Sequence, residues 1–126
     1  MKYDRLGVIS MSLARKSCKP CRGAVPVLNE EEISAYMKEV TEWQLVAGKK
    51  IKKKIEFKDF MGPMDLANKV AAVAESENHH PDLLIRWGAL EIEIWTHSVD
   101  GLTESDFILA AKIDQLANSI EKERKG

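Results

Sequence analysis

Two adjacent histidines, His79 and His80, and a third, His97, are the residues of this chain best suited to chemistry, because imidazole titrates close to neutral pH. They are the only histidines among the 126 residues. The pair follows Glu75 by four residues and directly precedes Pro81, whereas His97 lies beyond a predicted hairpin. Because that hairpin turns the chain back on itself, we expect the three imidazoles to converge on one acid/base site.

The length and charge of the chain exclude several classes of protein. A chain of this length fits one compact domain. Its 19 basic and 20 acidic residues nearly cancel, so net charge recruits neither nucleic acid nor an anionic membrane. No apolar run approaches the length needed to span a bilayer, and two cysteines do not make a disulfide framework. We therefore expect a cytoplasmic protein with no nucleic-acid or membrane partner.

The first 28 residues show no sustained helical or strand period, so 1–28 is predicted to be an irregular arm ahead of a single domain over 29–126. The arm carries two cysteines two residues apart, Cys18 and Cys21. A zinc site needs a second such pair, and a thioredoxin-like motif would follow a strand and open a helix. We favour a structural or incidental role, with a shared intersubunit metal or redox role as the alternative.

Two helices are predicted ahead of the histidines. The first spans roughly 30–40, since Asn29 suits an N-cap and acidic residues follow it. The second starts near Asp59 and keeps helical apolar spacing as far as Asn78, so it delivers the histidines at its C-terminal end. We expect Pro81 to stop it, because the residue before a proline avoids helical geometry.

Two hairpins, over 43–57 and 83–97, alternate apolar and polar residues. In the first, Ile51 is expected to face the core and the lysines to decorate the other side, where they protect a strand edge rather than bind phosphate. In the second, strict alternation puts His97 on the face opposite Ile92, although a bulge at the strand end shifts that register.

The last helix begins at a sequence that resembles a capping box, Thr103 to Asp106, with Asp in place of Glu. The element order is then helix, two strands, helix, two strands, helix. This order predicts an α+β fold, a four-stranded antiparallel sheet with three helices packed on one face. Because the sheet edges need cover, pairing with a second subunit is expected.

Each candidate also has a purely structural interpretation. A histidine pair at a helix end suits the helix dipole, and Glu75 one turn before His79 is a common surface pair. Asp106 is a helix cap in any event. Trp43 and Trp87, taken singly, are more typical of a core than of a ligand platform.

The spacing of the whole set is more specific than any member. The set consists of Trp43, Phe57-Lys58-Asp59-Phe60, Glu75, His79-His80-Pro81, Trp87, His97 and Asp106. It resembles the signature of the pterin-4a-carbinolamine dehydratases, also known as dimerisation cofactors of a hepatocyte homeodomain transcription factor. The resemblance covers roughly 29–121. Many members carry an aromatic residue where this chain has Leu83 or Leu84, which affects the expected pocket wall.

The resemblance implies a homodimer or homotetramer that catalyses a dehydration without metal or cofactor. The substrate would be a 4a-hydroxytetrahydropterin, which an aromatic amino acid hydroxylase forms when it activates oxygen. The products would be the quinonoid dihydropterin and water. The implied biological role is to recycle the tetrahydropterin cofactor of that hydroxylase.

The resemblance also implies roles for individual residues. The catalytic residues would be His79, His80, His97 and Asp106. His79 and His80 are candidate acids toward the 4a-hydroxyl and His97 the candidate base, with the division among them open. Asp106 would orient an imidazole. The substrate-binding residues would be Glu75, Trp43, Thr96, Asn78 and Pro81, with Glu75 and Thr96 at the polar edge of the pterin and Trp43 in the wall.

Two other functions remain as alternatives. One is a dimerisation or coactivator-type binding module on the same fold, although a scaffold has no need of three convergent imidazoles. The other is a metal-dependent hydrolase, with His79, His97 and either Asp106 or Glu75 as ligands.

Overall fold

The computed structural model describes residues 13–18 and 26–125. Its elements, in chain order, are α2 (Glu30–Met37), β1 (Gln44–Val46), β2 (Lys50–Glu56), α3 (Met61–Glu77), β3 (Asp82–Arg86), β4 (Ala89–Ile94), the short 3-10 helix η1 (His97–Val99) and α4 (Glu104–Lys125). This order confirms the predicted α+β arrangement. No helix in this part of the chain is long and apolar enough to cross a membrane.

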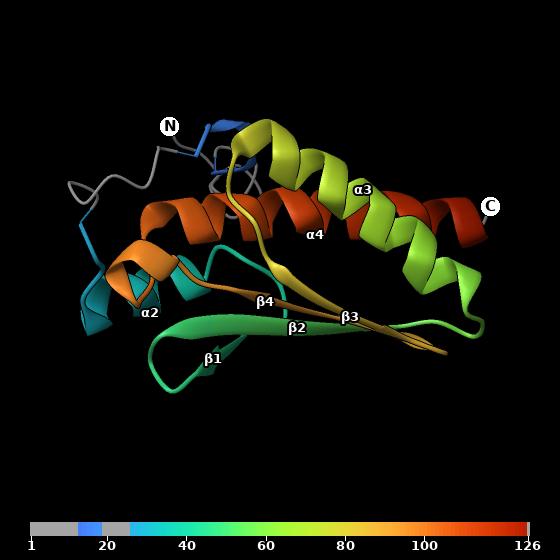
Figure 1. Ribbon diagram of the computed structural model, residues 1–126, viewed down its shortest axis with the longest axis horizontal. Helices are drawn as coiled ribbons and strands as arrows, with labels where there is room; N and C mark the ends of the chain where they lie inside the picture. The colour runs from blue at the N-terminus through green and yellow to red at the C-terminus, as the bar shows by residue number, and fades with distance from the viewer. Residues whose placement is uncertain (1–12, 19–25, 126) are drawn as a thin grey trace.

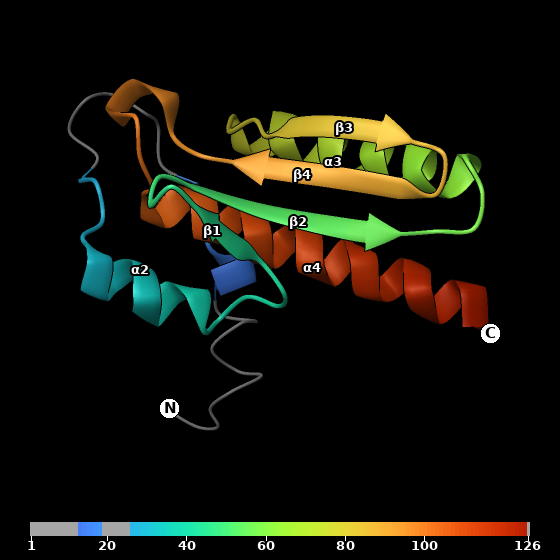
Figure 2. The ribbon, with the colours of Figure 1, turned by 90° about the horizontal axis from the view of Figure 1, so that it is seen from below.

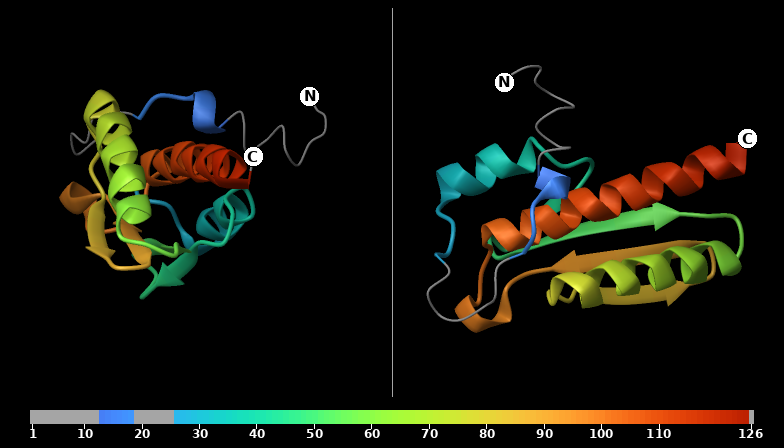
Figure 3. Two further views of the ribbon diagram at one scale, coloured as in Figure 1. Left: turned by 90° about the vertical axis from the view of Figure 1, so that its right-hand side faces the viewer. Right: turned by 90° about the horizontal axis from the view of Figure 1, so that it is seen from above.

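The four strands form one antiparallel sheet in the order β1-β2-β4-β3. Figure 1 shows α3 and α4 on one face of this sheet. Seen from below, α3 runs behind β3 and β4, and α4 lies between α3 and α2 (Figure 2). The end-on view of Figure 3 shows the same sequence of helices, so the helices share one face as predicted.

The core lies between this sheet and α4. Apolar residues at alternate positions of β2 and β4 face it, and Ile51, Leu90, Ile92 and Ile94 are all 0% exposed. Phe107 of α4 is equally buried, and its ring stacks on Tyr36 of α2 with centroids 5.2 Å apart. The period-two pattern therefore identified the buried face of both central strands correctly.

The opposite face of the sheet is covered by charge. Lys52 lies 3.1 Å from Glu91, and Arg86 of the edge strand also pairs with Glu91. Lys50 lies 3.8 Å from Glu93. Opposite charges on neighbouring strands stabilise the pairing and keep this face in water. The lysines of β2 were expected on this charged face, and Lys50 and Lys52 confirm that expectation.

Lys53 is the exception, and here the expectation was wrong. Lys53 lies two residues after Ile51, so it faces the core as well, and it is 8% exposed. Its Nζ lies 2.7 Å from Asp114 of α4 and donates to the Thr41 carbonyl at 2.9 Å. Trp43 is buried, as expected, and its indole N–H donates to the same carboxylate at 2.9 Å. A buried lysine is tolerated because its charge is paired.

Helix ends match the expectations in part. Asn29 caps α2 through a reciprocal capping box with Glu32. In contrast, Pro81 does not stop α3, because the helix already ends at Glu77 and Asn78 takes the left-handed conformation with φ 53°. The core position expected for Trp87 is also wrong, because Trp87 lies in the β3–β4 turn beside Gly88 and is 68% exposed.

The expected N-terminal arm is described only in part, and Cys21 lies outside the described residues. Residues 13–15 form a helical turn. Leu13 is 2% exposed and joins the core cluster, so this part of the arm is packed against the domain.

Candidate active site

Asp106, in the first turn of α4, is the centre of a buried polar cluster and is itself 0% exposed. Its Oδ1 lies 2.6 Å from Nε2 of His79. Its Oδ2 accepts hydrogen bonds from the Thr96 hydroxyl and the Thr103 backbone N–H, both at 2.8 Å. One carboxylate therefore joins the loop after α3, the segment after β4 and the start of α4.

The donors in this cluster follow from the chemistry of its groups. A carboxylate only accepts, so Nε2–H of His79 and the Thr96 hydroxyl both donate to Asp106. Thr96 has then used its proton, and the Thr103 hydroxyl, 3.0 Å away, donates to the Thr96 oxygen. Asp106 thereby sets which nitrogen of His79 carries hydrogen.

The end of α3 determines where His79 and His80 point. Because Asn78 is left-handed, the His79 N–H bonds back to the Ala74 carbonyl at 3.1 Å and the Asn78 N–H to the Glu75 carbonyl at 3.3 Å. These two bonds form a Schellman motif, which turns the chain off the helix axis. His79 is consequently 5% exposed, and His80 is exposed.

His80 pairs with Glu75 at the surface. Its Nε2 lies 2.7 Å from Oε2 of Glu75, and the two side chains are 52% and 78% exposed. The expected helical pair of Glu75 with His79 does not fit, because α3 ends before His79 and His79 no longer occupies a helical i+4 position. Glu75 therefore holds an imidazole that solvent and a ligand can reach.

His97 lies beyond the end of β4 and begins η1. The strand itself ends at Ile94, and Thr96 forms only an isolated bridge with Gly101, but burial still alternates as far as the buried Thr96. The His97 ring is exposed and packs edge-on against Trp95, with centroids 4.1 Å apart and an interplanar angle of 68°. His97 therefore lies on the exposed side with Trp95 and opposite the buried Ile92, as strict alternation predicted.

The two exposed histidines each follow a residue that is bonded to the Asp106 carboxylate. His80 follows His79 in the chain, and His97 follows Thr96, and both of these preceding residues bond to Asp106. Because consecutive Cα atoms are about 3.8 Å apart, each exposed imidazole begins one residue from the Asp106 cluster. The structure thus brings together the segments that carry all three histidines.

Other expected site residues have different positions. Trp43 bonds to Asp114, which lies two turns, or about 12 Å, beyond Asp106 along α4. The structure therefore separates Trp43 from the histidines. Thr96 is 1% exposed and its hydroxyl is committed within the cluster. Asn78 acts through its backbone, and Pro81 is half-buried at the entry to β3.

Thr103 is a member of the cluster that the sequence did not reveal as such. Its capping-box position predicted the bond from its N–H to Asp106, which is present. Its hydroxyl, however, lies beside Thr96. Nothing in the local sequence indicates that contact, because the two threonines belong to different structural segments.

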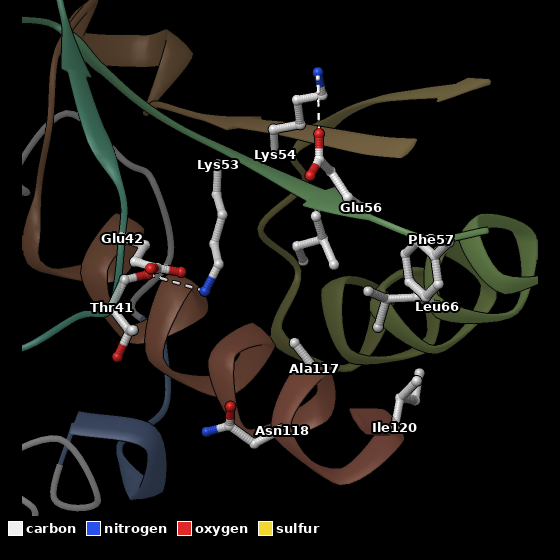
Figure 4. Close-up of a pocket in the computed structure, with 11 residues that line it drawn as sticks. Thr41, Glu42, Lys53, Lys54, Glu56, Phe57, Leu66, Ala117, Asn118 and Ile120 are labelled. Carbon is white, nitrogen blue, oxygen red and sulfur yellow. Dashed lines mark hydrogen bonds and ion pairs between the residues drawn. The ribbon is translucent and has the colours of Figure 1, made fainter. Parts of the chain in front are cut away.

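A hollow of about 490 Å³ lies elsewhere, between β2 and α4. Figure 4 shows Lys53 reaching across it toward Thr41, with Phe57 and Leu66 on its apolar side. None of the three histidines lines it. Within the described ranges no three His, Cys, Asp or Glu side chains gather as a metal site. The hollow is therefore separate from the segments that carry the three histidines.

Comparison with known proteins identifies the family of the chain. The family model of pterin 4 alpha carbinolamine dehydratase matches residues 26–116. A protein of Rickettsia bellii named pterin-4-alpha-carbinolamine dehydratase is 56% identical over 111 residues, which cover 87% of this chain and 98% of the relative. A relative of the same name from Rubrobacter xylanophilus is 43% identical over 82% of this chain and 97% of its own length.

Solved structures show the same fold. The crystal structure of a transcriptional coactivator/pterin dehydratase from Brucella melitensis superposes with a TM-score of 0.69 at 30% identity, and covers 73% of this chain and 99% of that chain. Half or more of the chain matches the family model, and the curated relatives are matched over nearly their full length. The chain therefore belongs to the pterin-4a-carbinolamine dehydratase family, whose members are hydro-lyases.

Proposed function

We propose that this protein converts a 4a-hydroxytetrahydropterin to the quinonoid dihydropterin and water by histidine acid/base catalysis. The observation that carries the proposal is the Asp106 cluster, which holds His79 directly and anchors the segments bearing His80 and His97. Membership of the dehydratase family supplies the substrate class.

The reaction needs two proton transfers. The hydroxyl on C4a accepts a proton and leaves as water, and a proton departs from the neighbouring ring nitrogen as the C=N double bond forms. Groups that titrate near neutral pH can both give and take protons under these conditions. Three imidazoles therefore suffice without any redox step.

Exposure suggests how the imidazoles divide these tasks. We assign direct proton transfer to His80 and His97, because both rings are exposed. His79 is nearly buried and is oriented by Asp106, so its task is to complete the site beside them. The pH dependence of kcat in variants of His80 and of His97 would show which imidazole acts as the acid and which as the base.

Substrate binding is assigned to the rim of the cluster. Glu75 is exposed beside His80 and offers a carboxylate to the polar edge of a pterin. Thr96 acts through Asp106, while Asn78 and Pro81 shape the loop that presents the histidines. Trp43 is left out of this wall because its indole is engaged with Asp114.

The proposal also includes partners. β3 is an edge strand of the sheet, and pairing of such an edge with a second copy would give the homodimer or homotetramer that the family resemblance implies. The substrate would come from an aromatic amino acid hydroxylase, and the product would return to that enzyme after reduction.

A coupled assay tests the activity. The dehydration of 4a-hydroxytetrahydropterin is followed with and without the protein, next to His80→Ala and a matched surface variant, Lys54→Met. Acceleration by the wild type and by Lys54→Met, but not by His80→Ala, supports the proposal. No acceleration by the folded protein overturns it and favours the alternative of a binding module on this fold.

A further inference from the structure

We infer that Glu77 and Lys112, together with residues 13–18, form a tether that keeps His79 against Asp106. The inference rests on the proposed function for its catalytic consequence. Its structural part, that this tether maintains the His79–Asp106 contact, stands independently of any activity and is tested separately below.

Glu77 links the end of α3 to two other segments. It is the last residue of α3, two positions before His79. Its Oε1 accepts the Cys18 backbone N–H at 2.8 Å, and its Oε2 lies 3.4 Å from Nζ of Lys112. Lys112 is on α4, about 9 Å beyond Asp106 at 1.5 Å per residue. The ion pair therefore ties together the two helices whose ends supply His79 and Asp106.

Residues 13–18 close the tether from outside. The Lys112 ammonium also donates to the Ala14 carbonyl at 2.5 Å, and the Cys18 thiol lies 3.5 Å from the carbonyl of Ser105, the neighbour of Asp106. Lys16 adds an ion pair with Glu104 at 2.8 Å. In the left view of Figure 3 this segment, in blue, crosses over α4 from the end of α3.

The electrostatics show that Glu77 is engaged as an anion. Burial alone would raise its pKa, but the bond from the Cys18 N–H and the nearby Lys112 ammonium bring the pKa below its usual value. The side chains of Glu77 and Lys112 are only 14% and 18% exposed. Salt screens a partly buried pair much less than a surface pair, so this contact should persist at ionic strengths that weaken exposed pairs.

The same surroundings explain Cys18. Burial raises the pKa of its thiol to about 12, and the Glu77 carboxylate acts in the same direction. A thiol that stays protonated is a poor nucleophile and a poor metal ligand. Cys18 therefore serves the docking of the segment, which agrees with the structural role favoured from the sequence.

The tether matters because His79 lies outside regular structure. The imidazole is hydrogen-bonded to a different element at 2.6 Å, and the segment that carries it begins at a helix end. Misplacement by about 1 Å can lower a rate by as much as 10²-fold. A fixed distance between the end of α3 and the start of α4 prevents that misplacement.

Kinetics of Glu77→Ala, Glu77→Gln and Lys112→Met test the catalytic part. We expect kcat to fall about 10-fold in Glu77→Ala with KM within about twofold, since the defect concerns orientation rather than binding. Glu77→Gln should be intermediate, because its amide oxygen still accepts the Cys18 N–H. The control is Lys54→Met, which breaks an ion pair with Glu56 at 3.8 Å on the opposite face of the sheet and should leave kcat unchanged.

A spectroscopic signature tests the tether without any substrate. In protein labelled with 15N-histidine, the buried Nε2–H of His79 gives a proton resonance far downfield, because its hydrogen bond to a carboxylate is short. We expect this resonance to move upfield or broaden in Glu77→Ala and Lys112→Met, and to stay in place in Lys54→Met. Asp106→Asn identifies the resonance by shifting it.

The outcomes separate the two ideas. An unchanged resonance and unchanged kcat in folded Glu77→Ala overturn the inference, even if the protein is an active dehydratase. A shifted resonance in a protein without activity supports the tether and refutes the proposed function. Should Glu77→Ala fail to fold, Glu77→Gln and Lys112→Met decide the question, with circular dichroism confirming their folded state.

Discussion

The imidazole of His79 and the carboxylate of Asp106 meet at 2.6 Å although 27 residues separate them in the chain. Both side chains are buried, so water cannot replace either partner. A buried polar group that loses its partner pays the full desolvation penalty. This single contact therefore couples the stability of the domain to the geometry of the proposed site.

Asp106→Ala should lower both stability and activity. The substitution leaves the His79 N–H, the Thr96 hydroxyl and the Thr103 N–H without their acceptor, so we expect a loss of about 2–3 kcal/mol in the free energy of unfolding. Urea unfolding measures it. A midpoint equal to that of the wild type would show that the Asp106 hydrogen bonds do not stabilise the fold.

His80→Ala and His79→Ala should differ in kind. Removing the exposed His80 should reduce turnover by about 10²–10⁴ with little change in stability, because it deletes a proton-transfer group from the surface. Removing His79 should reduce both turnover and stability, since it leaves Asp106 buried with one donor fewer. Steady-state kinetics and thermal unfolding of the two variants provide the comparison. Equal losses of stability in both would contradict the burial difference.

Lys53→Met should destabilise the protein and spare catalysis. The variant leaves the Asp114 carboxylate buried beside the remaining donors Trp43 and Thr41, and breaking a buried pair in this way costs about 3–5 kcal/mol. Because Asp114 lies about 12 Å from Asp106 along α4, kcat of the folded fraction should not change. A fall in kcat at temperatures where the variant is fully folded would argue against this separation.

The contribution of Glu77 should depend on pH. The bond from Cys18 and the charge of Lys112 outweigh burial and lower its folded pKa, so Glu77 stabilises the fold fully above its ordinary pKa of 4.5. That stability is lost as pH falls through the lowered folded pKa. We expect the unfolding free energies of wild type and Glu77→Gln to differ at pH 7 and to converge toward pH 3. A difference that persists unchanged at pH 3 would show that charge is not the cause.

Local pattern was sufficient for much of the fold. Alternation identified the buried residues of β4, and the acidic residues after Asn29 identified the start of α2, because strand parity and helix capping depend on neighbours within a few positions. The set of three histidines and Asp106 came from the resemblance to a known family, which depends on spacing over the whole domain. The order of elements then followed from the succession of periods.

Contacts between distant segments needed the tertiary structure. Lys53 shares the inner face of β2 with Ile51, yet the burial of its charge depends on Asp114, which lies 61 residues away. The left-handed Asn78 ends α3 early and turns His79 inward and His80 outward, a choice that the local sequence leaves open.

The sequence by itself therefore determined the elements, the core faces and the residues capable of proton transfer. Only the tertiary structure decided which imidazole Asp106 holds, that Trp43 lies apart from the histidines, and that Glu77 joins Lys112 to the N-terminal segment. The physical reason is that periodicity and capping act over one or two turns. The partner of a buried polar group depends instead on how whole helices pack against the sheet.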